Sequence, residues 1–214
     1  MSSEMLPCHS ELASEPPSNS WGSLENQEFS RGKINRLRPY QQEVALAILN
    51  SVFGRKGFTF SVEIARQGGK NELSAQLELL LLTLYMAEPQ NLIKCSPTFK
   101  PQTVISIMRL KDRLNDAGFD SIWTPELGYI IRLGNARAIF LSADESANVV
   151  GNTAHILLEI DESQDVSKEK YTKEFWFLFA YPQPVYLPLC RSFHPQTPTS
   201  SVRVLQKSGA SPGQ

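Results

Sequence analysis

The sequence has 214 residues, of which 41% are hydrophobic and 20% are charged, and its formal net charge is -1. This length allows one domain with a substantial buried core. Because the net charge is close to zero, no overall basic field indicates nucleic-acid binding, and such binding would need a local patch. A disulfide framework and a metal site of histidines and cysteines are not expected, because these residues are few and scattered: Cys8, Cys95, Cys190, His9, His155 and His194.

The two ends of the chain differ in composition from its middle. Residues 1–33 are rich in Ser, Glu and Pro and are expected to form a disordered arm without the apolar segment of a signal peptide. The most apolar run, residues 77–86, is too short to span a bilayer and contains Glu78. A soluble, cytoplasmic protein without membrane contact is therefore expected.

From residue 36 onward, helical and strand patterns alternate. Apolar spacing of three and four residues predicts helices at 36–53, 70–86 and 102–116. Short apolar runs predict strands at 58–64, 91–96, 129–133, 136–143 and 155–160, and Gly134-Asn135 predicts a hairpin between the third and fourth of them. This alternation is typical of an α/β domain with a largely parallel sheet flanked by helices, here at residues 34–175.

The segment 176–214 breaks this pattern. All 22 acidic residues lie at or before Glu174, and the remainder is crowded with Pro, Phe and Ser. One interpretation is a proline-rich, partly disordered tail. We favour another, in which the reading frame is disrupted near residue 175 and the tail is not an evolved part of the domain.

The loop sequence EIARQGGKNE, residues 63–72, partly matches a phosphate-binding loop. Such loops read Gly, four residues, Gly-Lys and then Ser or Thr, between a strand and a helix. Gly69 and Lys70 fit this pattern, whereas Ile64 replaces the first glycine and Asn71 replaces the hydroxyl residue. A Gly-Gly-Lys turn alone is more often structural, but the predicted strand before it and helix after it favour an anion site.

A second motif, ILLEIDE at residues 156–162, ends an apolar strand with two carboxylates. Phosphoryl transfer with Mg²⁺ uses one carboxylate on the metal side and another to position water. In a parallel sheet the carboxyl ends of strands meet at one edge, so Asp161 and Glu162 should lie near the loop. The alternative is an acidic turn that caps a helix.

Several blocks together resemble the ATPase part of phage terminase large subunits, the motors that package double-stranded DNA. The resemblance runs from about residue 36 to 173 and depends on LRPYQQEVA, ARQGGKNELSAQ, KCSPTFKPQ and FLSADESANVVGNTAHILLEIDESQDV. It implies a P-loop NTPase-type sheet, incomplete at the C-terminus, that binds ATP and Mg²⁺. In that family the loop often lacks the first glycine, so Ile64 fits, whereas Asn71 departs from the pattern.

The resemblance also implies roles for individual residues. Lys70 would contact phosphate, Glu162 would activate water, and Arg66 would stabilise charge on the γ-phosphate. Asp161 would lie on the Mg²⁺ side, where Asn71 could offer only an amide oxygen. The remaining nucleotide-binding residues implied are Tyr40, Gln41, Gln67, Gly68 and Gly69.

Partners also follow from the resemblance alone. It implies double-stranded DNA, the small terminase subunit and the portal as partners, with a homo-oligomeric ring in an intact protein. Because no acidic residue follows Glu174, no metal-dependent nuclease site is expected, and the chain is interpreted as a fragment. A helicase-like ATPase and a non-catalytic remnant of a terminase gene remain alternatives, the first because LRPYQQE and a DE-x-Q box also occur in helicases.

Overall fold

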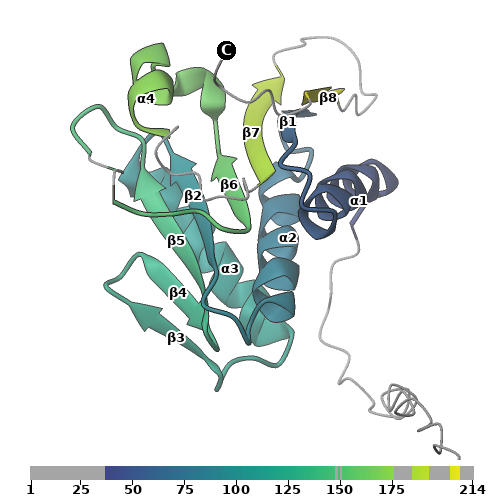
Figure 1. The fold of residues 1–214 in the computed structure, drawn as a ribbon, viewed down its shortest axis with the longest axis vertical. Coiled ribbons are helices and arrows are strands. Elements are labelled where there is room, and N and C mark those ends of the chain that lie inside the picture. The colour runs from purple at the N-terminus through teal and green to yellow at the C-terminus, as the bar shows by residue number, and fades with distance from the viewer. Residues whose placement is uncertain (1–36, 148, 150, 176–184, 193–202, 208–214) are drawn as a thin grey trace, which may run out of the picture. The chain divides into compact units, whose positions relative to one another are not determined.

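Residues 37–147, 149, 151–175, 185–192 and 203–207 are described by a computed structural model. Their organising element is an eight-stranded sheet with the order β3-β4-β5-β2-β6-β7-β1-β8 (Figure 1). The strands are β1 (Thr59–Ala65), β2 (Asn91–Ser96), β3 (Trp123–Glu126), β4 (Ile130–Leu133), β5 (Ala136–Ser142), β6 (Leu157–Ile160), β7 (Val185–Ser192) and β8 (Arg203–Lys207).

Parallel pairing runs through the middle of the sheet. Strands β5, β2, β6, β7 and β1 are each parallel to their neighbours in this series. At the edges, β4 pairs antiparallel with β5, β3 with β4, and β8 with β1. The predicted α/β fold with a largely parallel sheet is confirmed, as is the hairpin, which joins β4 and β5.

The three long helices are close to their predicted positions. They are α1 (Pro39–Phe53), α2 (Lys70–Leu84) and α3 (Val104–Asp116). Four short elements were not predicted from the sequence: the four-residue β3, which contains Pro125, and η2 (Phe99–Thr103), η3 (Ser163–Asp165) and α4 (Lys168–Lys173). Each is too short to show a hydrophobic period. Within the described residues, no helix is long and apolar enough to cross a membrane.

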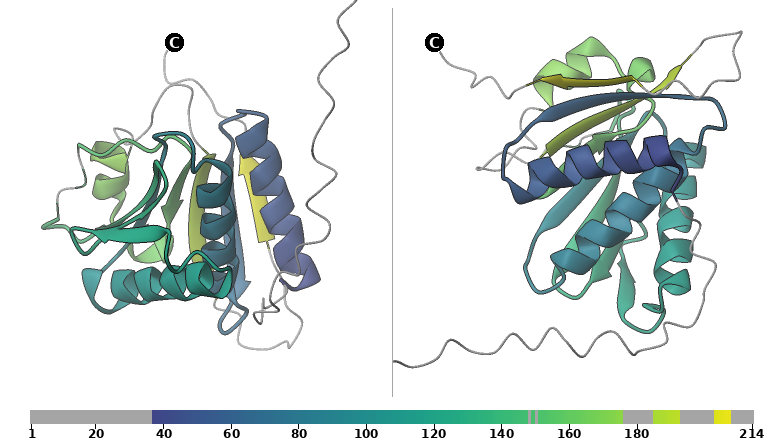
Figure 2. Two further views of the ribbon diagram at one scale, coloured as in Figure 1. Left: turned by 90° about the horizontal axis from the view of Figure 1, so that it is seen from below. Right: turned by 90° about the vertical axis from the view of Figure 1, so that its right-hand side faces the viewer.

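Apolar side chains cover both faces of the sheet. Leu92 of β2 belongs to a cluster that includes Ile48 of α1, Leu81 of α2 and Leu110 of α3. Its neighbour Ile93 points to the other face and joins a second cluster, which includes Cys95, Leu158, Val166 and Phe175. The three long helices therefore lie on one face of the sheet (Figure 2), and the segment that contains α4 packs against the other.

The prediction that residues 176–214 lie outside the domain is wrong for two stretches. β7 lies between β6 and β1, and β8 pairs with the other side of β1. Val185, Leu187 and Leu189 alternate along β7 and are each 1% exposed. The prolines obscured this period of two, and a strand inside a sheet needs no charged side chains. The predicted disordered arm at residues 1–33 lies outside the described residues.

Replacing Leu187 with Ala tests whether β7 is part of the core. Because this side chain is buried between neighbouring elements, Leu187→Ala should lower the free energy of unfolding by about 2–5 kcal/mol. Urea unfolding followed by circular dichroism measures the change. As a control, Leu46→Ala removes a leucine that is 59% exposed and should shift stability by less than about 0.5 kcal/mol. Equal stabilities of the two variants would contradict the placement of β7.

Candidate functional site

The loop of residues 66–69 joins the carboxyl end of β1 to the first residue of α2. Gln67 and Gly69 have φ angles of 62° and 80°, in the left-handed region. A Cβ atom on Gly68 would lie 2.5 Å from the Ile64 side chain and 2.8 Å from the carbonyl oxygen of Ala65. A Cβ atom on Gly69 would lie 2.6 Å from Gln41 Nε2. Both positions therefore require glycine, because the loop folds tightly against β1 and α1.

Two side chains of α1 hold this loop through hydrogen bonds to its carbonyl groups. The Tyr40 hydroxyl donates a hydrogen bond to the Gly68 carbonyl at 2.6 Å, and Gln41 Nε2 donates to the Gly69 carbonyl at 2.9 Å. Gln41 is 3% exposed, and its amide oxygen accepts from the Arg38 backbone N–H at 2.7 Å. In this structure Tyr40 and Gln41 shape the loop through these hydrogen bonds, and their role in nucleotide binding stays a prediction.

Lys70 meets both predicted carboxylates. Its Nζ lies 2.6 Å from Asp161 Oδ1 and 2.7 Å from Glu162 Oε1. The three side chains are between 7% and 10% exposed, so a lysine and two carboxylates share a nearly dry site. Charges buried to this extent need partners of opposite charge, and Lys70 supplies an ion-pair contact to each carboxylate.

Glu162 has an unusual backbone conformation at this point. Its φ angle is 46°, although it is not glycine, and its backbone N–H donates to Asp161 Oδ1 at 3.0 Å. Its other carboxylate oxygen, Oε2, accepts a hydrogen bond from Gln164 Nε2 at 2.7 Å. Side chains held in sparsely populated backbone conformations cluster at functional sites. Glu162 is the N-cap residue of η3, but its side chain makes no capping hydrogen bond and instead reaches Lys70.

A hollow of about 370 Å³ opens beside the loop and is lined by loop atoms, Lys70, Asn71 and Glu162. Arg66 is exposed at its edge. Arg109 of α3, which was not predicted from the sequence, also lines this hollow. Its Nη1 lies 3.6 Å from Glu72 Oε2. The sequence signal for Arg109 was its spacing from Arg113, one helical turn later, which places both arginines on one face of α3. In the structure that face lies against Glu72. Three cationic groups and the N-terminus of a 15-residue helix favour a polyanion here.

The protein oxygens at this site could hold Mg²⁺ only together with oxygens from a bound phosphate group and water. Asp161 offers a buried carboxylate and Asn71 an amide oxygen at the start of α2. The described residues contain no group of three or more His, Cys, Asp or Glu side chains able to hold a metal. Mg²⁺ is commonly held by one or two carboxylates together with water and substrate phosphates, so this site fits it as part of a nucleotide complex.

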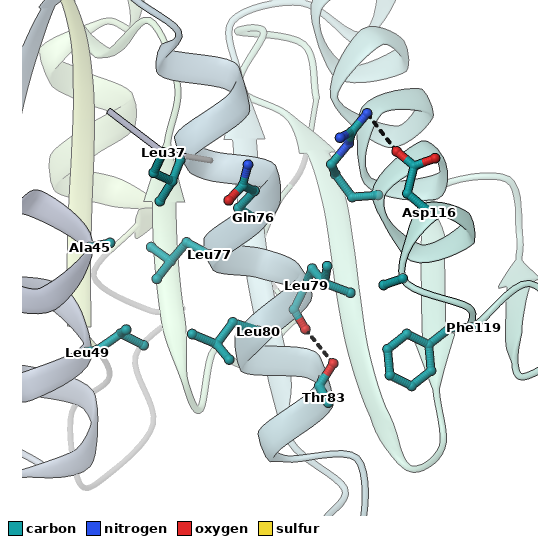
Figure 3. A pocket seen from close by; sticks show the side chains of 12 residues that line it. Leu37, Ala45, Leu49, Gln76, Leu77, Leu79, Leu80, Thr83, Asp116 and Phe119 are labelled. Carbon is teal, nitrogen blue, oxygen red and sulfur yellow. Dashed lines mark hydrogen bonds and ion pairs between the residues drawn. The ribbon is translucent and has the colours of Figure 1, made fainter. Parts of the chain in front are cut away.

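Another hollow, of about 310 Å³, lies between α1, α2 and α3 (Figure 3). Leucines such as Leu49, Leu77 and Leu80 line it, and its one arginine, Arg113, forms an ion pair with Asp116 at 2.9 Å. It therefore offers a phosphate group only one arginine, which is already paired, whereas Arg66, Lys70 and Arg109 lie around the hollow beside the loop. The hollow beside the loop is the better candidate.

The contact between Gly69 and Gln41 can be tested with a matched pair of glycines. Gly128 has nearly the same φ angle as Gly69, 79° against 80°, but a Cβ atom there meets nothing within 4 Å. Gly128→Ala should therefore cost only the backbone strain, about 1–2 kcal/mol of unfolding free energy. Gly69→Ala adds the clash with Gln41 and should cost about 1–3 kcal/mol more. Equal losses in urea unfolding would show that Gln41 does not fix the loop.

Comparisons with known proteins agree with the fold. No protein-family model and no curated protein matches the sequence. Among solved structures, the large terminase of bacteriophage HK97 superposes with a TM-score of 0.56 and 19% identity, over 72% of this chain and 33% of that chain. The large terminase ATPase domain of Thermus phage P74-26 gives 0.53 and 17%, over 72% of this chain and 70% of the domain.

A third match is the large terminase of another thermophilic bacteriophage, solved in complex with ATP-γ-S. Its TM-score is 0.54 at 12% identity, over 72% of this chain and 38% of that chain. The chain thus spans between a third and two fifths of the HK97 protein and of this third match. At these identities the likeness concerns the fold. The chain has the α/β fold of phage large-terminase ATPase domains.

Proposed function

We propose that this chain binds ATP with Mg²⁺ and hydrolyses it as the motor domain of a phage-type DNA-packaging terminase. The observation that carries the proposal is the position of Lys70, at the start of α2, between Asp161 and Glu162 at the end of β6. The fold supports it, since similar structures are terminases and one of them was solved with ATP-γ-S. The tight loop geometry and the cationic hollow add the features that a polyphosphate needs.

The proposed roles follow from what each side chain can reach. Backbone N–H groups where the loop meets the start of α2 and the ammonium group of Lys70 bind the phosphates. The guanidinium of Arg66, exposed at the edge of the hollow, neutralises charge that develops on the terminal phosphate. Glu162 orients and deprotonates the attacking water, helped by the hydrogen bond from Gln164.

Binding of a nucleotide would exchange one set of ionic contacts for another. In the structure Lys70 forms ion pairs with both carboxylates. When phosphate oxygens enter the hollow, Lys70 turns to them, and Asp161 and Glu162 become available for a metal ligand and for water. A bound Mg²⁺ would neutralise part of the negative charge of the phosphates. Asp161 would hold it, with Asn71 contributing an amide oxygen where related loops have a hydroxyl.

Partners and cellular location are proposals by likeness to terminases. They are double-stranded DNA, the small terminase subunit, the portal, a homo-oligomeric ring and the cytoplasm of a bacterial host. The net charge of -1 gives no general attraction to DNA, so DNA contact would need a local basic surface or neighbouring subunits. A non-catalytic protein is the alternative, and it differs from the proposal in nucleotide binding.

Two substitutions separate nucleotide binding from hydrolysis. Lys70→Ala should weaken the binding of a fluorescent ATP analogue by at least about 100-fold, because a buried charge-assisted contact of roughly 3 kcal/mol is lost. Glu162→Gln should bind the analogue normally but hydrolyse ATP about 100-fold or more slowly, because the amide has no basic oxygen to take a proton. Fluorescence titration and phosphate release measure the two effects.

The control for Lys70 is Lys56→Ala, which removes an exposed lysine before β1, at the opposite end of that strand. Unchanged analogue binding in Lys70→Ala would remove the basis of the proposal.

The same titration against Mg²⁺ tests Asn71. Asn71→Thr should lower the Mg²⁺ concentration at half-saturation, because a hydroxyl is the more compact ligand, and an unmoved midpoint would place Asn71 away from the metal.

A further inference from the structure

Directly beneath the site lies a buried ionic cluster, made of Lys94 of β2, Glu159 of β6, and Ser74 and Glu78 of α2. Lys94 Nζ lies 2.8 Å from Glu159 Oε1 and 2.9 Å from Glu78 Oε1, and it also donates to the Ser74 hydroxyl. The Ser74 hydroxyl in turn contacts Glu159 at 2.5 Å and Glu78 at 2.9 Å. All four residues are at most 3% exposed.

The chemistry of the cluster makes its contacts strong and directional. Lys94 and Glu159 are register partners on adjacent parallel strands, so their side chains point together to the face that α2 covers. The carboxylates of Glu159 and Glu78 raise the pKa of Lys94, although burial alone would lower it. Burial raises the pKa of Glu78 to about 7. When Glu78 is protonated, the positive charge of Lys94 balances the negative charge of Glu159, and the cluster is neutral.

The cluster connects the two elements that supply the candidate site. Ser74 and Glu78 lie one and two turns after Lys70 on α2. Glu159 lies two residues before Asp161, and the charge of Asp161 also raises the pKa of Lys94. The rotation and height of α2 over β6 decide whether Lys70 reaches Asp161 and Glu162.

Packing alone does not require these charges. Buried ion clusters can often be replaced by apolar side chains of similar volume with no loss of stability, or even a gain. Leucines of α2 such as Leu77 and Leu81 already pack this helix on the sheet. Apolar contacts are not directional, so they fix the rotation of α2 about its own axis poorly, whereas hydrogen bonds and ion pairs fix it well.

We propose that Lys94, Glu159, Glu78 and Ser74 are positioning residues that fix α2, and with it Lys70, against Asp161 and Glu162. This inference rests on the proposed function only for its effect on ATP turnover. Its effect on α2 is a property of the protein without nucleotide. The two can therefore fail separately.

Hydrogen exchange of the nucleotide-free protein tests the positioning directly. In the triple variant Glu78→Met, Lys94→Met and Glu159→Met, the amides of residues 73–76 should exchange at least about tenfold faster, because the start of α2 opens locally. Amides of α3 should keep their rates, and the urea midpoint should not fall. Ser74→Ala, which removes only the shared hydroxyl, should act in the same direction by about threefold and serves if the triple variant does not fold. Its control is Ser51→Ala, which removes a hydroxyl from α1 that is also 1% exposed.

Turnover gives the second measurement. If the chain hydrolyses ATP, Ser74→Ala and the triple variant should raise KM, because Lys70 binds the phosphates, and should also lower kcat, the triple by about tenfold or more, because Glu162 acts in the reaction step. If exchange at residues 73–76 quickens but the unmodified protein neither binds nor hydrolyses ATP, the positioning holds and the proposed function fails. Wild-type exchange at residues 73–76 in Ser74→Ala, or in a folded triple variant, would overturn the positioning role.

Discussion

The structure depends on one electrostatic constraint, the burial of Lys70 between Asp161 and Glu162. A lysine and two carboxylates that are at most 10% exposed need partners of opposite charge, and without a ligand they find them in one another. This contact requires the start of α2 and the end of β6 to meet at one edge of the sheet. Parallel pairing of β6 with its neighbours provides that meeting, because it places the turns that follow β1 and β6 on the same side.

Other features of the site adapt the backbone to this constraint. The loop of residues 66–69 must turn sharply between β1 and α2, and the left-handed φ angle of Gly69 together with the tight packing of Gly68 allows it to do so. Tyr40 and Gln41 bind the carbonyl groups that this turn exposes. Beneath it, the Lys94 cluster holds α2 against β6. Side chains of α1 thus hold the loop, and the cluster of charged side chains holds α2 against the sheet.

The sequence predicted the elements with a clear hydrophobic period and the motifs with a fixed spacing. The three long helices, the hairpin at Gly134-Asn135 and the meeting of Lys70 with Asp161 and Glu162 follow from such local patterns. β7 was missed because Pro188 interrupts its alternating apolar residues and because its partners, β6 and β1, lie far away in the chain. Lys94 and Glu159 were missed for a related reason. Within an apolar run, a single charge shows no partner until the strands are placed side by side.

Thermal unfolding in the presence of ATP is the measurement that tests the central claim most directly. A ligand that binds only the folded state stabilises it by about 2.7 kcal/mol at 100 times its dissociation constant. If Lys70 and its carboxylates form a site for the phosphates of ATP and Mg²⁺, the unfolding temperature should rise steadily with their concentration. Adenosine, which has no phosphate, should leave it unchanged. An unfolding temperature that stays constant up to millimolar ATP and Mg²⁺ would contradict the account.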